Sequence, residues 1–205
     1  MKNPKLNNDQ LYEQGLFSLY EMEDTDAALD SFFGAAAAGY EPAYGEIGVI
    51  FSSERNDQEK AESWFEKVEN IESFSPVAAY EYGALLYNAK NDWEAALIYL
   101  FKAAQMEYVP AYQAIAVILY QELGEIDEAE AWFEKAKEEG CLCVIPAYYY
   151  GILREFERGI DGEAEYYRAR AIEDLCGPKS KQDLNYLNAL PGVSHRGLPP
   201  EFKGG

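Results

Sequence analysis

Apolar side chains recur along most of the chain at the spacing of amphipathic helices. Tyr44, Ile47 and Phe51 stand at positions i, i+3 and i+7, which places them on one face of a helix. A second stripe with the same spacing consists of Tyr112, Ile115 and Leu119. Short polar segments separate such stripes. The pattern predicts a succession of short helices, each with one buried face.

A pair of small residues recurs five times along the chain. The second member is always an alanine 13 positions after the first, and the pairs are Gly15 and Ala28, Gly48 and Ala61, Gly83 and Ala96, Ala116 and Ala129, and Gly151 and Ala164. Successive pairs are 33, 35, 33 and 35 residues apart. The two-residue differences in length therefore fall outside the constant 13-residue spacing. We therefore predict a repeat of two helices, with insertions confined to connecting loops.

Helix-ending residues mark the same divisions independently of the periodicity. Prolines near the start of first helices, where a missing amide hydrogen leaves no bond unmade, are Pro42, Pro76, Pro110 and Pro146. Gly39 and Gly140 stand where second helices stop. Capping or acidic groups precede the second helices at Thr25-Asp26, Asn56-Asp57, Asn91-Asp92 and Ile126-Asp127. The turn inside each repeat is therefore predicted to be only a few residues long.

A single helix pair cannot bury its apolar stripe alone, so the pairs are expected to stack on one another. The predicted organisation is an N-terminal extension at 1–8, five repeats over 9–175, a capping helix at 176–190 and a flexible tail at 191–205. The cap offers apolar side chains for the open end of the stack, namely Leu184, Tyr186, Leu187 and Leu190. The tail is rich in Pro and Gly and has few apolar residues.

Two segments carry a family resemblance. They are Ala43-x-x-x-Ile47-Gly48-x-x-Phe51 in a first helix and Ala129-x-x-Trp132-Phe133-x-Lys135-Ala136 in a second. Over roughly residues 9–175 the chain resembles the tetratricopeptide-like superfamily and, within it, the Sel-one-like repeats. The units lack the glycine-containing loop of Sel-one-like repeats and have the length of an ordinary tetratricopeptide repeat. The resemblance implies an all-α fold, a right-handed superhelical α-solenoid of about five helix-turn-helix repeats with a C-terminal capping helix, and protein binding along a concave groove.

Net charge narrows the range of partners. The chain has 17 Lys and Arg against 37 Asp and Glu, which gives a formal net charge of −20. Phosphate groups would be repelled, so nucleic acid and an anionic membrane surface are improbable partners. A basic protein is the natural alternative. The same acidity also serves solubility, which is the simpler interpretation.

The sequence favours a cytoplasmic location. The first residues are polar and do not resemble a secretion signal. Every apolar stretch falls far short of the roughly 20 residues that cross a bilayer. Cys141, Cys143 and Cys176 are an odd number at no framework spacing, which suits a reducing compartment.

Residues for catalysis or metal binding are not assembled in any recognisable pattern. His195 is the only histidine and lies in the predicted tail, where no oriented base can be built. Cys141-Leu-Cys143 has no second pair of ligands nearby for a zinc site. Single glycines never form a phosphate-binding loop. We predict no enzyme activity, no catalytic residue, no metal and no cofactor.

Tyrosine is abundant, with 17 residues in 205. In tetratricopeptide-like folds the groove-facing positions of the first helix lie three before, and one and four after, the small residue used here as reference. These positions hold Tyr12, Leu16, Leu19, Gly45, Val49, Ser52, Tyr80, Ala84, Tyr87, Gln113, Val117, Tyr120, Tyr148, Ile152 and Glu155. Tyrosine is enriched at binding hot spots because it offers a large rigid surface with a polar tip. The rings can equally fill gaps between neighbouring first helices.

Acidic residues accompany these tyrosines at Glu13, Glu46, Glu81 and Glu155. An acidic groove favours a ligand with Lys or Arg, which can also stack on the rings. The predicted partner-binding residues are Tyr12, Tyr80, Tyr87, Gln113, Tyr120, Tyr148, Glu46, Glu81 and Glu155.

The leading hypothesis is a binding module for a basic protein or peptide. One concrete form is a bacterial immunity protein that neutralises a basic toxin, a suggestion by analogy of fold. The alternatives are a general adaptor or scaffold, an acidic inhibitor that mimics nucleic acid, and, as a minor third class, a hydrolase that uses clustered carboxylates.

Overall fold

The computed structural model describes residues 6–160, and these residues form helices with no strand among them. The helices are α1 (Asn8–Tyr20), α2 (Thr25–Ala36), α3 (Glu41–Val49), α4 (Gln58–Phe65), α5 (Pro76–Lys90), α6 (Trp93–Gln105), α7 (Pro110–Ile118), α8 (Ile126–Glu138) and α9 (Val144–Ile152). π-Helical turns extend three of the first helices, at Ile50–Glu54 after α3, Leu119–Leu123 after α7 and Leu153–Glu157 after α9. A 3-10 turn, Ile71–Ser73, precedes α5.

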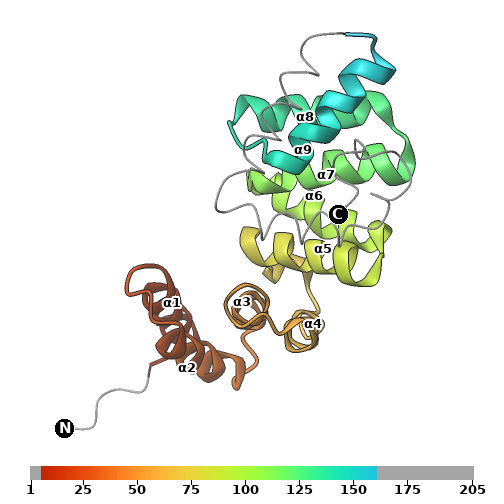
Figure 1. Cartoon of the computed structure of the whole chain (residues 1–205). Helices are drawn as coiled ribbons and strands as arrows, with labels where there is room; N and C mark the ends of the chain where they lie inside the picture. The colour runs from red at the N-terminus through yellow and green to blue at the C-terminus, as the bar shows by residue number, and fades with distance from the viewer. Residues whose placement is uncertain (1–5, 161–205) are drawn as a thin grey trace, which may run out of the picture.

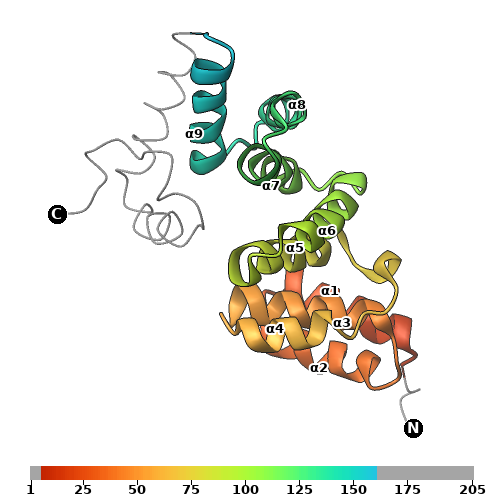
Figure 2. The ribbon, with the colours of Figure 1, turned by 90° about the vertical axis from the view of Figure 1, so that its right-hand side faces the viewer.

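Consecutive helices form pairs that stack in chain order. Within the pairs, α1 packs on α2, α3 on α4, α5 on α6 and α7 on α8, and each second helix also packs on the first helix of the next pair. Figure 1 shows the pairs following one another from α1 and α2 at the lower left to α9 at the top. Figure 2 shows the same succession from the side. This arrangement is an α-solenoid, in which each unit is in contact mainly with its neighbours.

The first helices lie on the inner side of this stack. Helices α3, α5 and α7 pack in turn on α5, α7 and α9. Second helices of successive pairs make no comparable contact within residues 6–160. In a curved row of helix pairs the more closely spaced helices are on the concave side. We call the surface of the first helices on that side the inner face.

In the first three pairs a glycine on the first helix faces a large apolar residue on the second. These are Gly15 and Phe32, Gly48 and Phe65, and Gly83 and Leu100. A Cβ atom added to Gly48 would lie 2.5 Å from Cε1 of Phe65, far inside van der Waals contact. The alanine that follows each glycine by 13 residues, as in Ala61, is fully buried. The fixed spacing therefore marks the point where the two helices of a pair come closest.

The turn inside each pair recurs five times with one geometry. A residue with left-handed φ lies in each of these turns, at Glu23 (53°), Asn56 (51°), Asn91 (56°), Gly124 (68°) and Gly159 (65°), and the first four precede second helices of the described chain. The next amide donates to the carbonyl six residues earlier, as from Asp57 to Phe51 at 2.8 Å. This bond satisfies a carbonyl that the end of the first helix would leave unpaired. Because the turns recur with the spacing of the small residues, each unit has the same internal frame.

Aspartates cap the second helices of the first three pairs. The carboxylates of Asp24, Asp57 and Asp92 each accept a hydrogen bond from the backbone N–H three residues on. The predicted caps at Asn56-Asp57 and Asn91-Asp92 therefore have the expected role. In the first pair the cap lies one residue before the predicted Thr25-Asp26. Glu125 takes the position in the fourth pair without a capping side-chain bond.

One helix end carries a residue that its backbone does not favour. Glu107 has φ 60° after α6, where Gly39 and Gly140 fill the corresponding positions after α2 and α8. A side chain in this region costs about 1–2 kcal/mol, while glycine raises unfolded-state entropy by about 0.5–1 kcal/mol. We expect Glu107→Gly to raise the unfolding free energy by about 0.5 kcal/mol in urea titrations. Glu107→Ala, which removes the carboxylate but keeps the Cβ, should give no gain, and an equal gain there would contradict the explanation.

The core consists of two clusters of buried side chains that meet at Phe51. The smaller one surrounds Phe32 and Ile47 in the first two pairs, and the larger one extends from Phe65 to Leu153. Their members come from successive pairs, so no unit contains a complete core. The apolar stripes of neighbouring units therefore bury one another, as the repeat requires.

The predicted all-α fold is confirmed, with four complete helix pairs and the first helix of a fifth in residues 6–160. The second helix of the fifth repeat, the capping helix at 176–190 and the tail at 191–205 lie outside the described residues, and so do residues 1–5 of the extension. The count of five repeats and the right-handed superhelix stay predictions. Along the described ranges, none of the helices has both the length and the apolar character of a membrane span.

Candidate partner-binding face

Basic residues occur on the first helices only at the C-terminal ends, as Lys90 at the end of α5 and Arg154 in the turn after α9. The first-helix segments 8–20, 41–54, 76–89, 110–123 and 144–153 contain no Lys or Arg, although they contain acids such as Glu13, Glu46 and Glu81. The basic residues of the described chain lie on or beside second helices, or at the C-terminal ends of first helices: Arg55, Lys60, Lys67, Lys90, Lys102, Lys135, Lys137, Arg154 and Arg158. The repeat thus restricts basic residues to the second helices and to the ends of first helices, while acidic residues lie on both rows.

Several of these basic side chains are already paired away from the inner face. Arg154 lies 2.7 Å from Glu130, and Lys90 lies 2.7 Å from Glu62. The Lys67 ammonium lies 3.3 Å from the centre of the Trp64 ring. Exposed ion pairs contribute little to stability. Their relevance is that they leave few cations in the described chain to balance the acids of the first helices.

The nine predicted partner-binding residues divide into two groups by burial. Five are partly exposed: Tyr12, Tyr80, Tyr148, Glu81 and Glu155. The other four are buried: Glu46 (1% exposed), Tyr87 (6%), Tyr120 (7%) and Gln113 (9%). The buried group therefore shapes the wall beneath the inner face, and a partner reaches it only when covering side chains move.

Gln113 and Tyr87 connect successive units. The Gln113 side-chain oxygen accepts a hydrogen bond of 2.9 Å from the Cys143 amide at the start of α9. The Tyr87 hydroxyl donates to Gln121 at 3.3 Å and to Glu122 at 3.1 Å in the next unit. These bonds fix the position of one first helix relative to the following one.

Glu46 is the most unusual of the predicted residues. It lies on α3, and its Oε1 accepts a hydrogen bond of 3.4 Å from the Tyr12 hydroxyl of α1. Its Oε2 is buried without a hydrogen-bond partner among residues 6–160. Burial raises the pKa of Glu46, and hydrogen bonding with the Ser75 and Tyr12 hydroxyls acts in the opposite direction. A carboxylate in this setting is destabilising unless it is protonated or finds a cation.

Glu81 holds the same repeat position as Glu46 in the next unit, two residues before the small residue. Its Oε2 accepts a hydrogen bond of 2.9 Å from the Ser52 hydroxyl. Burial raises the pKa of Glu81 as well, with the Ser52 bond acting against it. Two consecutive first helices therefore carry carboxylates whose hydrogen-bond donors are hydroxyl groups and not Lys or Arg side chains.

Tyrosines surround these two carboxylates. Burial and the nearby Glu46 and Tyr108 raise the pKa of Tyr20 to about 12. The pKa of Tyr108 is raised by burial and by Glu81, and its ring lies 5.3 Å from that of Tyr80. We call Tyr12, Tyr20, Tyr80 and Tyr108 the tyrosine cluster. Two of its members lie on α1, one on α5 and one in the loop before α7.

Sequence reasoning predicted two members of this cluster and missed Tyr20 and Tyr108. A signal for Tyr108 exists, because an aromatic residue stands two positions before three of the helix-starting prolines, at Tyr40, Phe74 and Tyr108. Ring contacts join Tyr12 to Tyr40 at 5.4 Å and Tyr80 to Tyr108 at 5.3 Å. Tyr20 has no tyrosine at the equivalent positions of the other repeats, so the repeat pattern does not identify it.

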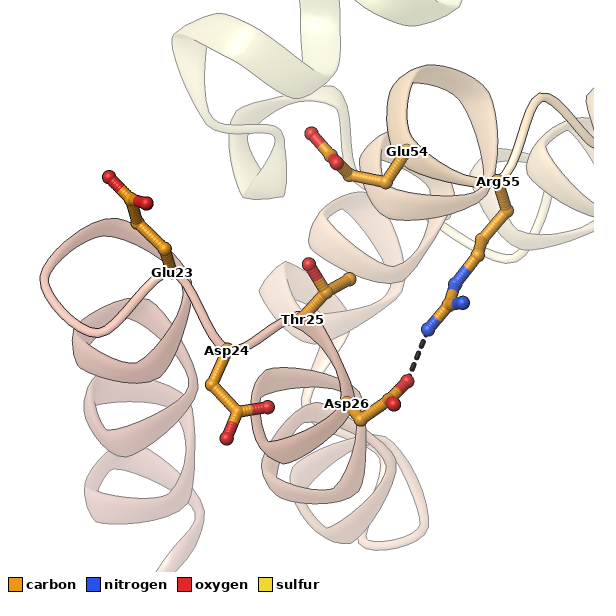
Figure 3. A pocket seen from close by; sticks show the side chains of 6 residues that line it. All are labelled: Glu23, Asp24, Thr25, Asp26, Glu54 and Arg55. Atoms are coloured by element: carbon orange, nitrogen blue, oxygen red, sulfur yellow. Dashed lines mark hydrogen bonds and ion pairs between the residues drawn. The ribbon is translucent and has the colours of Figure 1, made fainter.

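A shallow hollow of about 530 Å³ lies at the turns of the first two pairs and is lined by Glu23, Asp24, Thr25, Asp26, Glu54 and Arg55. Figure 3 shows Arg55 reaching across it to pair with Asp26. Asp24 is occupied as the cap of α2. Across residues 6–160 no group of three or more His, Cys, Asp or Glu side chains is placed to hold a metal ion.

The packing of successive helix pairs defines a helical-repeat α-solenoid. No protein-family model and no curated protein matches the chain. Among solved structures, it is similar to the crystal structure of a Sel1 repeat protein from Oxalobacter formigenes, with a TM-score of 0.54 and 18% identity. The similarity covers 96% of this chain and 84% of that chain. It confirms the Sel-one-like solenoid fold that the resemblance implies.

Proposed function

We propose that this protein is a non-enzymatic interaction module whose inner face binds a basic protein or peptide. The observation that carries the proposal is the absence of Lys and Arg from the five first-helix segments, beside carboxylates on consecutive helices. Electrostatic complementarity of this kind speeds association and excludes acidic partners. Partly exposed rings such as Tyr80 and Tyr148 supply the contact area.

The narrower form of this proposal is an immunity protein that neutralises a basic toxin. It is supported by the small size, the net charge of −20 and the repeat fold. A single basic protein that copurifies in equal amount would favour this form, whereas several partners with a shared basic segment would favour an adaptor. Binding that disappears between about 50 and 200 mM salt would instead indicate a mimic of nucleic acid.

The test uses matched double variants of the full chain. Tyr80→Ala with Tyr148→Ala removes two rings of the inner face, and we expect partner capture from the source cells to fall at least about ten-fold, because tyrosine anchors are common hot spots. The measurement is quantitative mass spectrometry of proteins copurified with each variant. Circular dichroism and thermal melting check that both variants are folded.

The control is Phe33→Ala with Ile98→Ala. Both side chains are exposed, on second helices α2 and α6. This control should retain the partners that the inner-face variant loses. If the two variants capture the same proteins in the same amounts, the inner face is not the binding surface.

A further inference from the structure

The Glu46 carboxylate lacks a charged hydrogen-bond donor of the kind that a Lys or Arg side chain provides. Its Oε2 is buried and has no hydrogen-bond partner in the described chain, its Oε1 accepts a long bond from Tyr12, and the only groups that stabilise its charged form are the hydroxyls of Ser75 and Tyr12. A native fold rarely leaves a buried polar atom without a partner, so each such atom needs a reason. No Lys or Arg of the described chain contributes to the pKa shift of Glu46. The missing group is a charged N–H donor.

The surroundings of Glu46 suit a cation. The carboxylate is directed to the Tyr12 hydroxyl, and it lies within electrostatic reach of Tyr20, which is 55% exposed. Aromatic faces attract ammonium and guanidinium groups, more strongly when these are partly desolvated. A basic side chain that enters past Tyr12 and Tyr20 would therefore meet rings at the surface and the free Oε2 beneath them.

The positions of Glu46 and Glu81 on neighbouring helices indicate how far apart the Lys or Arg side chains of a partner would lie. Glu46 and Glu81 hold equivalent positions on α3 and α5, which pack on each other. Packed helices have axes about 8–10 Å apart. A polyproline II segment presents every third side chain on one face, with a rise of about 3.1 Å per residue, or about 9 Å between them. Carboxylates at equivalent positions on packed helices therefore suit Lys or Arg side chains three residues apart.

We propose that Glu46 and Glu81 anchor two Lys or Arg side chains, three residues apart, of an extended partner segment, with the tyrosine cluster around them. This inference rests on the proposed function and specifies its ligand. Glu46 is the deeper anchor, reached when the Tyr12 ring moves aside. Glu81 is the shallower anchor, and the partner's Lys or Arg side chain replaces the Ser52 hydroxyl as its hydrogen-bond donor.

Synthetic peptides test the register directly. The probe is acetyl-Lys-Pro-Pro-Lys-Pro-Pro-Lys-amide, together with its arginine counterpart, and the comparison peptide has the same composition with its three lysines adjacent. Isothermal titration at low salt should show that the spaced peptide binds at least about ten-fold more tightly, a difference of roughly 1.4 kcal/mol. Equal affinities would overturn the inference, because charge alone would then explain the binding.

Three charge-removing variants locate the anchors. Glu46→Gln and Glu81→Gln should each weaken binding of the spaced peptide about ten-fold or more. Glu128→Gln removes one exposed carboxylate from α8 on the other helix row and should change it less than about two-fold. Unchanged binding by Glu46→Gln, with its fold verified by circular dichroism, would refute the deeper anchor.

The outcome separates this inference from the proposed function. If the peptides and the glutamine variants show no difference, while Tyr80→Ala with Tyr148→Ala still loses its cellular partners, the inner face binds proteins by another register. If the inner-face variant keeps its partners, the proposed function itself fails.

Discussion

A Gly48→Ala protein is expected to be about 1–3 kcal/mol less stable than the natural chain, even though alanine is the better helix former. The added Cβ would lie 2.5 Å from Cε1 of Phe65 and 2.6 Å from its Cδ1. Phe65 is fully buried on α4 and cannot move away. Relief therefore requires the two helices to separate. Urea titration followed by circular dichroism measures the loss.

Two further proteins show whether the ring is the cause. Gly34→Ala is the control, because its nearest neighbour is Cδ1 of the flexible Leu11 at 3.3 Å, and we expect it to be neutral or stabilising by about 0.5–1 kcal/mol. Phe65→Ala should cost about 3–5 kcal/mol. In that background Gly48→Ala should cost nothing more, a coupling of about 1–3 kcal/mol. An undiminished cost would show that the clash lies elsewhere.

Glu46→Gln is expected to stabilise the protein at neutral pH by about 1–3 kcal/mol, because it replaces a buried carboxylate with a neutral group of the same shape. Burial raises the pKa of Glu46 in the folded state, so folding favours its protonated form relative to the unfolded chain. The stability this form provides is complete below the unfolded pKa and is lost as pH rises through the folded pKa. The advantage of Gln should therefore be small near pH 4 and grow toward pH 8.

The measurement is the difference in unfolding free energy between Glu46→Gln and the natural chain at each pH. The groups that face Glu46 are the hydroxyls of Tyr12, Tyr20 and Ser75, and no Lys or Arg contributes to its pKa shift. Glu13→Gln is the control, since Glu13 holds the equivalent position on α1 and is exposed. It should change stability by less than about 0.5 kcal/mol. A Glu46→Gln protein that is less stable than the natural chain at pH 8 would show that the carboxylate is well paired.

Stability and binding should respond to Glu46→Gln in opposite directions. The variant gains stability because a buried charge is removed, and it loses the peptide because the same charge is the proposed anchor. If the variant lost the peptide because it unfolds, its stability and its peptide affinity would both be lower. A site that reduces stability in the free protein and recovers it on binding is the usual trade-off at functional positions.

Much of the candidate site could be proposed from the repeat, and its limits have a specific cause. Tyr12, Tyr80 and Tyr148 are partly exposed on first helices. Tyr120, also at a predicted groove position, and Glu46, which lies beside one, are buried. A helical pattern gives the direction of a side chain from its own helix. Whether that side chain meets solvent depends on the next helix, which the pattern does not describe.

The amino-acid sequence by itself determined the helices, their pairing and the repeated turn, because these depend on local chemistry. Apolar spacing, proline at helix starts, and Asp after a left-handed residue act over a few positions, as in Asn56-Asp57. Only the tertiary structure decided the burial of Glu46. A Cβ on Gly45 would lie 3.1 Å from that of Ala78, so the absence of a side chain there lets α5 pack close to α3. That close approach covers the neighbouring carboxylate, whereas Glu13, at the same position on α1, remains exposed.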